Sequence, residues 1–177
     1  MSKGAIMKNS CPLQAAQIKI RPIEAAHDKE LYELIRLILK SYGLDRPGTA
    51  YYDPELANLS SYYSQDKAAY FVMVDNMGTV IGGVGVAPFL GTTGELQKLY
   101  LHPDYRKLGL GEMLLRRALA FAPKYYTSLY LETHSNLKEA VPLYEKMGFR
   151  HLSGPLPGGP HSEMNIWMEK LTLNSHK

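Results

Sequence analysis

The sequence predicts a mixed α/β domain, in which a single sheet carries helices. Two observations predict it: segments with strand-like alternation or β-branched residues, and segments with apolar residues at three- and four-residue steps. Along the 177 residues these follow the order β-α-α-β-β-β-α-β-α-β-β. We expect a flexible N-terminal tail over residues 1–16 and one domain over 17–173, with a six- to seven-stranded sheet flanked by about four helices.

The N-terminal half begins with an alternating strand over 17–21, which Pro22 ends. A helix is expected from about Ala26 until Gly43, a plausible stop, and a short second helix from Pro54 with Asp53 as its cap. The apolar face of the first helix consists of Leu31, Leu34, Ile35 and Ile38.

A β-hairpin follows over 69–74 and 79–89, because a turn signal at 75–78 separates two runs rich in β-formers. The glycines of its second strand indicate a bend or a close backbone approach; they are Gly82, Gly83 and Gly85.

The C-terminal half predicts alternating strands and helices, and it ends in two strands around a Gly/Pro-rich connection over 153–160. The expected strands are 95–101, 128–133, 149–152 and 164–171. The expected helices run from near Gly109 to Pro123 and from Lys138 to Met147, where Gly148 closes the second.

Composition excludes several classes of function. The net charge is only +3 and the basic residues are scattered, so we expect no nucleic-acid partner. The single cysteine, Cys11, excludes an intramolecular disulfide and a multi-cysteine metal site. No apolar run reaches the ~18 residues of a membrane helix, and the N-terminus is a poor signal peptide. We therefore expect no membrane association and a cytoplasmic location.

The junction after the strand 95–101 indicates an anion site. It contains Arg106-Lys107-Leu108-Gly109-Leu110-Gly111. Two glycines let successive N–H groups point into one concavity, and the helix N-terminus adds partial positive charge. A simple turn between strand and helix is the alternative. The loop is not a phosphate loop of the Walker type, because Glu112 follows Gly111, and a dinucleotide fingerprint would need a third glycine.

With a second motif at residues 143–149, the chain resembles the GNAT superfamily, the Gcn5-related N-acetyltransferases. The pattern Arg106-x-x-Gly109-x-Gly111 resembles that family's loop for the pyrophosphate of CoA, and Leu143-Tyr144-Glu145-Lys146-x-Gly148-Phe149 resembles its second hallmark. The sequence between strand and loop is also similar to that of the family; it reads His102-Pro103-Asp104-Tyr105-Arg106. The resemblance covers roughly residues 18–171.

The resemblance implies a splayed sheet with a GNAT-like acyl-CoA N-acyltransferase fold, acetyl-CoA as cosubstrate and no metal. The pantetheine arm is expected beside Leu99-Tyr100-Leu101, where main-chain groups pair with it as an added strand would. Many relatives carry a CoA-contacting asparagine seven residues before the tyrosine; here that position is Leu137, and Asn136 stands one step early. Asn136 is kept as a candidate contact. The other candidate contacts are Arg106, Lys107, Leu108, Gly109, Leu110 and Gly111.

Acid and base candidates follow from the same comparison. An amine attacks a thioester only as the free base, so a base or a water chain must take its proton. Tyr144 matches the tyrosine that protonates the CoA sulfur in many relatives, and the alternative is a packed helix residue. Glu95 and Glu132 compete as the base, with a slight preference for Glu95, and water alone is a third option. The loop with His161 could cover the acceptor site.

These features predict an enzyme that transfers acetyl from acetyl-CoA directly to a primary amine of a small molecule or peptide, in a ternary complex. The alternative is a non-catalytic acyl-CoA-binding sensor or scaffold, which needs the glycine loop but not the proton groups. A nucleotide-phosphate binder would leave the Tyr144 motif without a purpose. A homodimer is possible for this fold.

Overall fold

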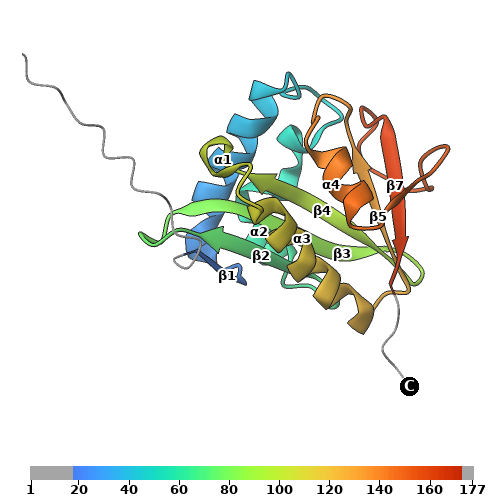
Figure 1. The fold of residues 1–177 in the computed structure, drawn as a ribbon, viewed down its shortest axis with the longest axis horizontal. Helices are drawn as coiled ribbons and strands as arrows, with labels where there is room; N and C mark the ends of the chain where they lie inside the picture. The colour runs from blue at the N-terminus through green and yellow to red at the C-terminus, as the bar shows by residue number, and fades with distance from the viewer. Residues whose placement is uncertain (1–17, 173–177) are drawn as a thin grey trace, which may run out of the picture.

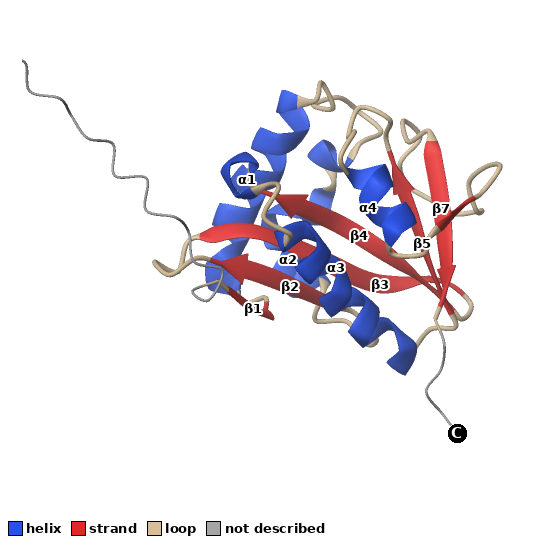
Figure 2. Ribbon diagram, in the orientation of Figure 1, coloured by secondary structure: helices blue, strands red, loops and turns tan. Residues whose placement is uncertain are grey.

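The computed structural model describes residues 18–172 and confirms the predicted mixed sheet with helices (Figures 1 and 2). Its seven strands lie in the order β1-β2-β3-β4-β5-β7-β6, and all neighbours are antiparallel except β4 and β5. The strands are β1 Lys19–Pro22, β2 Ala69–Val74, β3 Val80–Leu90, β4 Thr93–Leu101, β5 Ser128–Thr133, β6 Arg150–His151 and β7 Ile166–Leu171.

Helices cover both faces of the sheet and create two hydrophobic cores. The α-helices are α1 Asp28–Ser41, α2 Leu59–Tyr62, α3 Leu110–Phe121 and α4 Ala140–Lys146. Successive side chains of β2 alternate between the cores: Phe71 and Met73 pack with α3, whereas Tyr70, Val72 and Val74 pack with α1. The central strands are therefore buried on both sides, which fixes their register.

The feature that creates a site is the splay between β4 and β5. The two strands pair in parallel only from Thr93–Ser128 to Glu95–Tyr130, and then they part (Figure 1). A bulge in β4 accompanies the splay: the β3 register shifts between Gly83 and Gly85, and Lys98 has a φ of +50°. Beyond Glu95, the edge of β4 that faces away from β3 has no strand partner among residues 18–172.

The glycines of β3 allow a close approach, as the sequence predicted. A Cβ on Gly85 would lie 2.3 Å from the Tyr63 hydroxyl oxygen, and one on Gly83 would lie 2.4 Å from the Tyr70 ring. Both tyrosines are buried against this strand. The missing side chains therefore make room for two aromatic rings, and Tyr63 in turn reaches the site described below.

Some local expectations were wrong. The segment from Pro54 begins as a 3-10 helix over Pro54–Asn58, and only then continues into α2. Asp53 stands at the predicted cap position, but its side chain makes no capping hydrogen bond and instead contacts Lys98 and His161. A buried ammonium group is a stronger partner for a carboxylate than a backbone N–H. The expected tail, with Cys11, falls outside the described residues, whose helices include none long and apolar enough to cross a membrane.

Candidate active site

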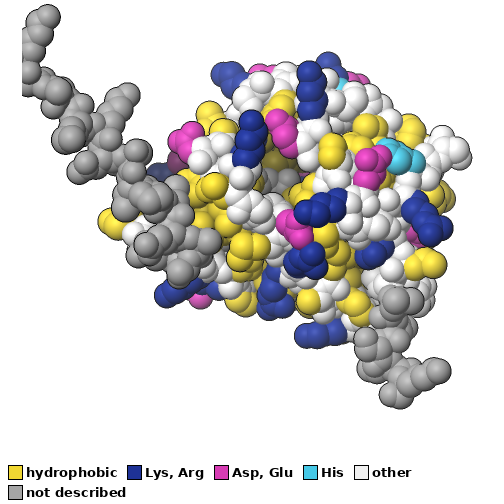
Figure 3. All heavy atoms as spheres, viewed as in Figure 1, with side chains coloured by type: hydrophobic (Ala, Val, Ile, Leu, Met, Phe, Trp, Pro, Cys, Tyr) yellow, Lys and Arg dark blue, Asp and Glu magenta, His cyan; other side chains and the backbone are white. Residues whose placement is uncertain are grey.

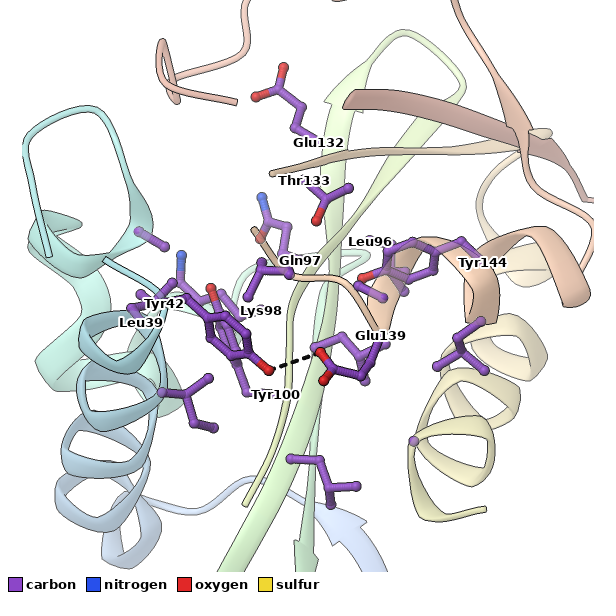
Figure 4. Close-up of a pocket in the computed structure, with 18 of the residues that line it drawn as sticks. Leu39, Tyr42, Leu96, Gln97, Lys98, Tyr100, Glu132, Thr133, Glu139 and Tyr144 are labelled. Carbon is purple, nitrogen blue, oxygen red and sulfur yellow. Dashed lines mark hydrogen bonds between the residues drawn. The ribbon is translucent and has the colours of Figure 1, made fainter. Parts of the chain in front are cut away.

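A cavity of about 430 Å³ occupies the splay between β4 and β5. Its walls come from α1, the outer half of β4, the N-terminus of α3, α4, and the loop with His161. A hollow opens on the face that carries α3 and α4, with charged side chains at its rim (Figure 3). Figure 4 shows the lining side chains converging from α1 and α4 over β4.

The structure brings most of the predicted site residues to this one cavity. Those that line it are Glu95, Leu99, Tyr100, Leu101, Arg106, Lys107, Gly109, Leu110, Gly111, Glu132 and Tyr144. Leu108 is half exposed and lies outside the lining, and so does Asn136, whose amide donates to the backbone carbonyl of Tyr42 at 3.0 Å. Leu137, which stands where many GNAT relatives have the CoA-contacting asparagine, does line the cavity.

One end of the cavity presents the N-terminus of α3. Gly109 precedes α3 with a φ of +76°, and Lys107 has a φ of +61°, so the loop turns sharply into the helix. A Cβ on Gly109 would meet no other atom within 4 Å, and one on Gly111 would meet only Leu143 at 3.4 Å. The first N–H groups of a 12-residue helix are thus presented at the cavity.

Arg106 stands at the same end, and its partners were not predicted. Its guanidinium donates to the Tyr42 hydroxyl at 2.8 Å, and that hydroxyl donates to Oε2 of Glu139 at 2.9 Å (Figure 4). Tyr42 follows α1 and Glu139 precedes α4, so the contact spans the cavity. No local pattern marks either residue, because the pair lies 97 positions apart in the sequence.

Tyr144 projects from α4 into the cavity (Figure 4). Its residue is 7% exposed, and burial raises the pKa of its hydroxyl above the usual value. Its ring packs edge-on against Phe149, and no residue of 18–172 hydrogen-bonds its hydroxyl. The hydroxyl is therefore protonated at neutral pH and available to a ligand.

Glu95 is a buried carboxylate at the point where β4 and β5 part. Burial raises its pKa, and the charge of Glu132 adds to the rise, whereas the hydrogen bond from Gln97 and the charges of His161 and Lys98 oppose it. Gln97 donates to it at 2.5 Å and accepts from the Tyr63 hydroxyl at 2.7 Å. The chain from Gly85 through Tyr63 and Gln97 thus fixes the orientation of Glu95.

Glu132 also lines the cavity but is arranged differently. Its carboxylate turns away from Gln97 and Thr133 (Figure 4). Oε1 accepts from the Tyr130 hydroxyl at 2.8 Å, while Oε2 is buried and finds no partner among residues 18–172. A Cβ on Gly159 would lie 2.1 Å from this carboxylate, so the 153–160 connection lies directly over it.

Residues 46–53 and 161–163, far apart in the sequence, contact each other near the Glu132 end of the cavity, and we call these two segments the roof. Glu163 contacts Arg46 at 3.1 Å and donates its backbone N–H to Gly48 at 3.2 Å, and His161 Nε2 lies 2.9 Å from Asp53. A second cavity of about 390 Å³ lies under the roof. It shares Glu132, His161 and Met164 with the first cavity and is otherwise lined by residues 155–159, Ser162 and Trp167.

Lys98 on β4 contacts the roof through Asp53. The sequence analysis did not predict this role. Its side chain is only 4% exposed and pairs with Asp53 and, at 3.4 Å, with Glu55. The available signal was its position in a predicted strand, two residues from Leu96 and from Tyr100, since a buried lysine requires carboxylate partners. Among residues 18–172, no three His, Cys, Asp or Glu side chains are grouped as a metal site.

Acetyl-CoA fits this cavity by its chemistry. An unpartnered strand edge suits the amides of a pantetheine arm, a glycine-opened helix N-terminus suits a diphosphate, and an unbonded phenol suits a sulfur leaving group. The residues that would hold it are those of the outer half of β4, the loop 106–111, and Tyr144.

Fold and site together define an acyl-CoA-dependent transferase. The sequence model of the acetyltransferase (GNAT) family matches residues 31–149, and the chain belongs to this family. It is 36% identical over 154 residues to YjgM, an uncharacterized N-acetyltransferase of Escherichia coli, covering 84% of this chain and 92% of that one. It is 30% identical to an uncharacterized N-acetyltransferase of Schizosaccharomyces pombe, covering 82% and 93%.

Solved structures agree on the fold. An acetyltransferase of the GNAT family from Staphylococcus aureus superposes with a TM-score of 0.80 at 22% identity, covering 88% of this chain and 99% of that one. A spermidine N-acetyltransferase from Vibrio cholerae, solved with CoA and spermine, gives 0.63 at 22%, covering 89% and 96%. The protein is thus an N-acetyltransferase, which decides against a non-catalytic sensor.

Proposed function

We propose that this protein transfers the acetyl group of acetyl-CoA directly to a primary amine, with both substrates bound at once. The observation that carries the proposal is the single cavity that contains a freed strand edge, an anion-binding helix N-terminus, a phenol and a buried carboxylate. The bound thioester supplies the acetyl group. A base candidate, Glu95, and an acid candidate, Tyr144, line the same cavity, which supports direct transfer.

Glu95 is proposed as the base that takes a proton from the incoming ammonium. Its raised pKa makes it a better proton acceptor near neutrality than an exposed glutamate, and Gln97 holds it in place. Glu132 is the second candidate, but its carboxylate lies under the connection at Gly159. Tyr144 is proposed as the acid that protonates the departing sulfur.

The acceptor is proposed to enter beneath the roof, where the two cavities meet at Glu132, His161 and Met164. The charges at this end favour a cation. Glu95 and Glu132 line the cavity together with Lys98, and the charge of Lys98 is already offset by its two partners, Asp53 and Glu55. A primary amine that arrives as an ammonium ion fits this balance better than an anionic acceptor.

The test is a screen of small amines, amino acids and peptide N-termini for acetyl-CoA-dependent release of thiol. We expect amine-dependent release by the wild type and at least about a 100-fold loss in Glu95→Gln. Glu145→Gln, at an exposed position on α4, is the control and should match the wild type. Thiol release that no amine stimulates would reject the proposal.

A further inference from the structure

His161 occupies an unusual position for a loop residue, because it lines both cavities and is held by a carboxylate. Its Nε2 lies 2.9 Å and 3.2 Å from the two oxygens of Asp53. Its side chain is 18% exposed, whereas Glu95 at the bottom of the same cavity is buried. His161 is therefore a titratable group that lies between the buried end and solvent.

The partners of Asp53 determine which ring nitrogen of His161 carries the proton. Hydrogen bonds from His161 and the charge of Lys98 lower the pKa of Asp53 despite its burial. An ionised carboxylate only accepts hydrogen bonds, so Nε2 must be the protonated nitrogen. In the neutral ring Nδ1 is then a free acceptor, and no residue of 18–172 hydrogen-bonds it.

The local charges leave room for a proton on this ring. Asp53 and Glu55 carry two negative charges, and Lys98 between them carries one positive charge. The remaining negative charge can balance an imidazolium at His161. The other titratable groups that face His161 across the cavities, Glu95 and Glu132, are also acidic.

The proposed reaction needs such a group. An alkylammonium and an acetyl thioester give an amide, a thiol and one proton, so the amine nitrogen loses two protons in all. One goes to the sulfur, and the other must reach solvent. Glu95 is too buried to pass its proton directly to bulk water.

We propose that His161, oriented by Asp53, relays the reaction's surplus proton from the buried end of the cavity to solvent. Nδ1 accepts the proton and forms an imidazolium beside the Asp53 carboxylate. The imidazolium then gives this proton to water. Asp53 is a positioning residue, since it acts through His161. This inference rests on the proposed transfer to an amine.

The test compares His161→Gln and His161→Ala with His151→Gln as the matched control, because His151 makes a similar 2.8 Å contact with Glu145 on the surface. We expect His161→Gln to lower kcat by about 10- to 100-fold near pH 7 with unchanged acetyl-CoA affinity. The deficit should shrink toward pH 10, where the acceptor arrives as free amine. Added imidazole should restore part of the rate of His161→Ala, and Asp53→Asn should show the same pH dependence.

A His161→Gln rate within twofold of the control at every pH would overturn the relay. So would a loss that neither pH nor imidazole changes, because that is the behaviour of a structural role. The wild-type protein gives a test that needs no variant: the ring ¹⁵N shifts of His161 should report the Nε2–H tautomer when the ring is neutral. The Nδ1–H tautomer would overturn the arrangement, even if no amine proved to be a substrate.

Discussion

The Tyr42 hydroxyl donates a 2.9 Å hydrogen bond to Oε2 of Glu139, and so a side chain after α1 meets one before α4 across the cofactor cavity (Figure 4). The same hydroxyl accepts from Arg106. The hydrogen bond from Tyr42 and the charges of Arg106 and Lys107 lower the pKa of Glu139, and together they outweigh its partial burial, which raises the pKa. The basic loop expected to bind a diphosphate is thus already close to one of the protein's own anions.

Replacing Glu139 by Gln should therefore tighten acetyl-CoA binding. Removing a partly exposed like charge from the diphosphate end is expected to improve Kd about two- to fivefold, with a weaker gain at high salt. Calorimetric titration at two salt concentrations measures it. Glu145→Gln, on the outer face of α4, should leave Kd unchanged. Weaker binding by the Glu139 variant would show that the bridge organises the site rather than competing for it.

Glu95→Gln should lower activity and raise stability at neutral pH. A folded-state pKa that is raised contributes stability that is complete below the unfolded pKa and is lost as pH rises through the folded pKa. The wild type therefore loses stability as pH rises above the ordinary glutamate pKa of 4.5, and the neutral variant does not. Melting temperatures across pH 4–8 should show the advantage of the variant growing with pH.

Comparing Glu95→Gln with Glu132→Gln shows which of the two glutamates is the base. With Glu95 as base, Glu132→Gln should retain far more kcat than Glu95→Gln. The reverse order would transfer the role to Glu132, and equal small losses would indicate water.

Tyr144→Phe should reduce kcat about 10- to 100-fold while acetyl-CoA affinity stays near that of the wild type. Burial keeps the hydroxyl protonated throughout the accessible range, so we expect no loss of activity from its ionisation below pH 10. Tyr105→Phe is the control, because Tyr105 bonds to Asp75 outside the cavity. A Tyr144→Phe enzyme with full turnover would exclude the tyrosine as the acid.

Gly85→Ala should damage both stability and rate, because the new methyl group would collide with the buried ring of Tyr63. Overpacking of this kind costs about 1–3 kcal/mol, and the displaced Tyr63 would release Gln97 from its contact with Glu95. Denaturant unfolding and kcat together measure the effect. Gly154→Ala, at an open loop position, should change neither. A stable variant with normal kcat would mean that Tyr63 does not support the base.

Much of the fold was predictable because its elements are locally encoded. The apolar stripe of α1, the turn at Asp75–Gly78 and the glycines around α3 each act within one segment. The wrong expectation for Asp53 has a tertiary cause, since Lys98 on β4 and His161, 108 residues away, attract its carboxylate. Tyr42 and Glu139 escaped notice for the same reason.

The central claim is that the N-terminus of α3 and the freed edge of β4 bind acetyl-CoA, and Gly109 tests it most directly. A side chain there would enter open cavity space, and its φ of +76° would cost about 1–2 kcal/mol. Gly78 matches that strain, with a φ of +84° and equally open surroundings, but it lies in the β2–β3 turn.

Calorimetric titration of acetyl-CoA into the wild type, Gly109→Val and Gly78→Val separates binding from strain. We predict one site per chain in the wild type and in Gly78→Val, and at least about a tenfold loss of affinity in Gly109→Val. No binding by the wild type, or undiminished binding by Gly109→Val, would contradict the account.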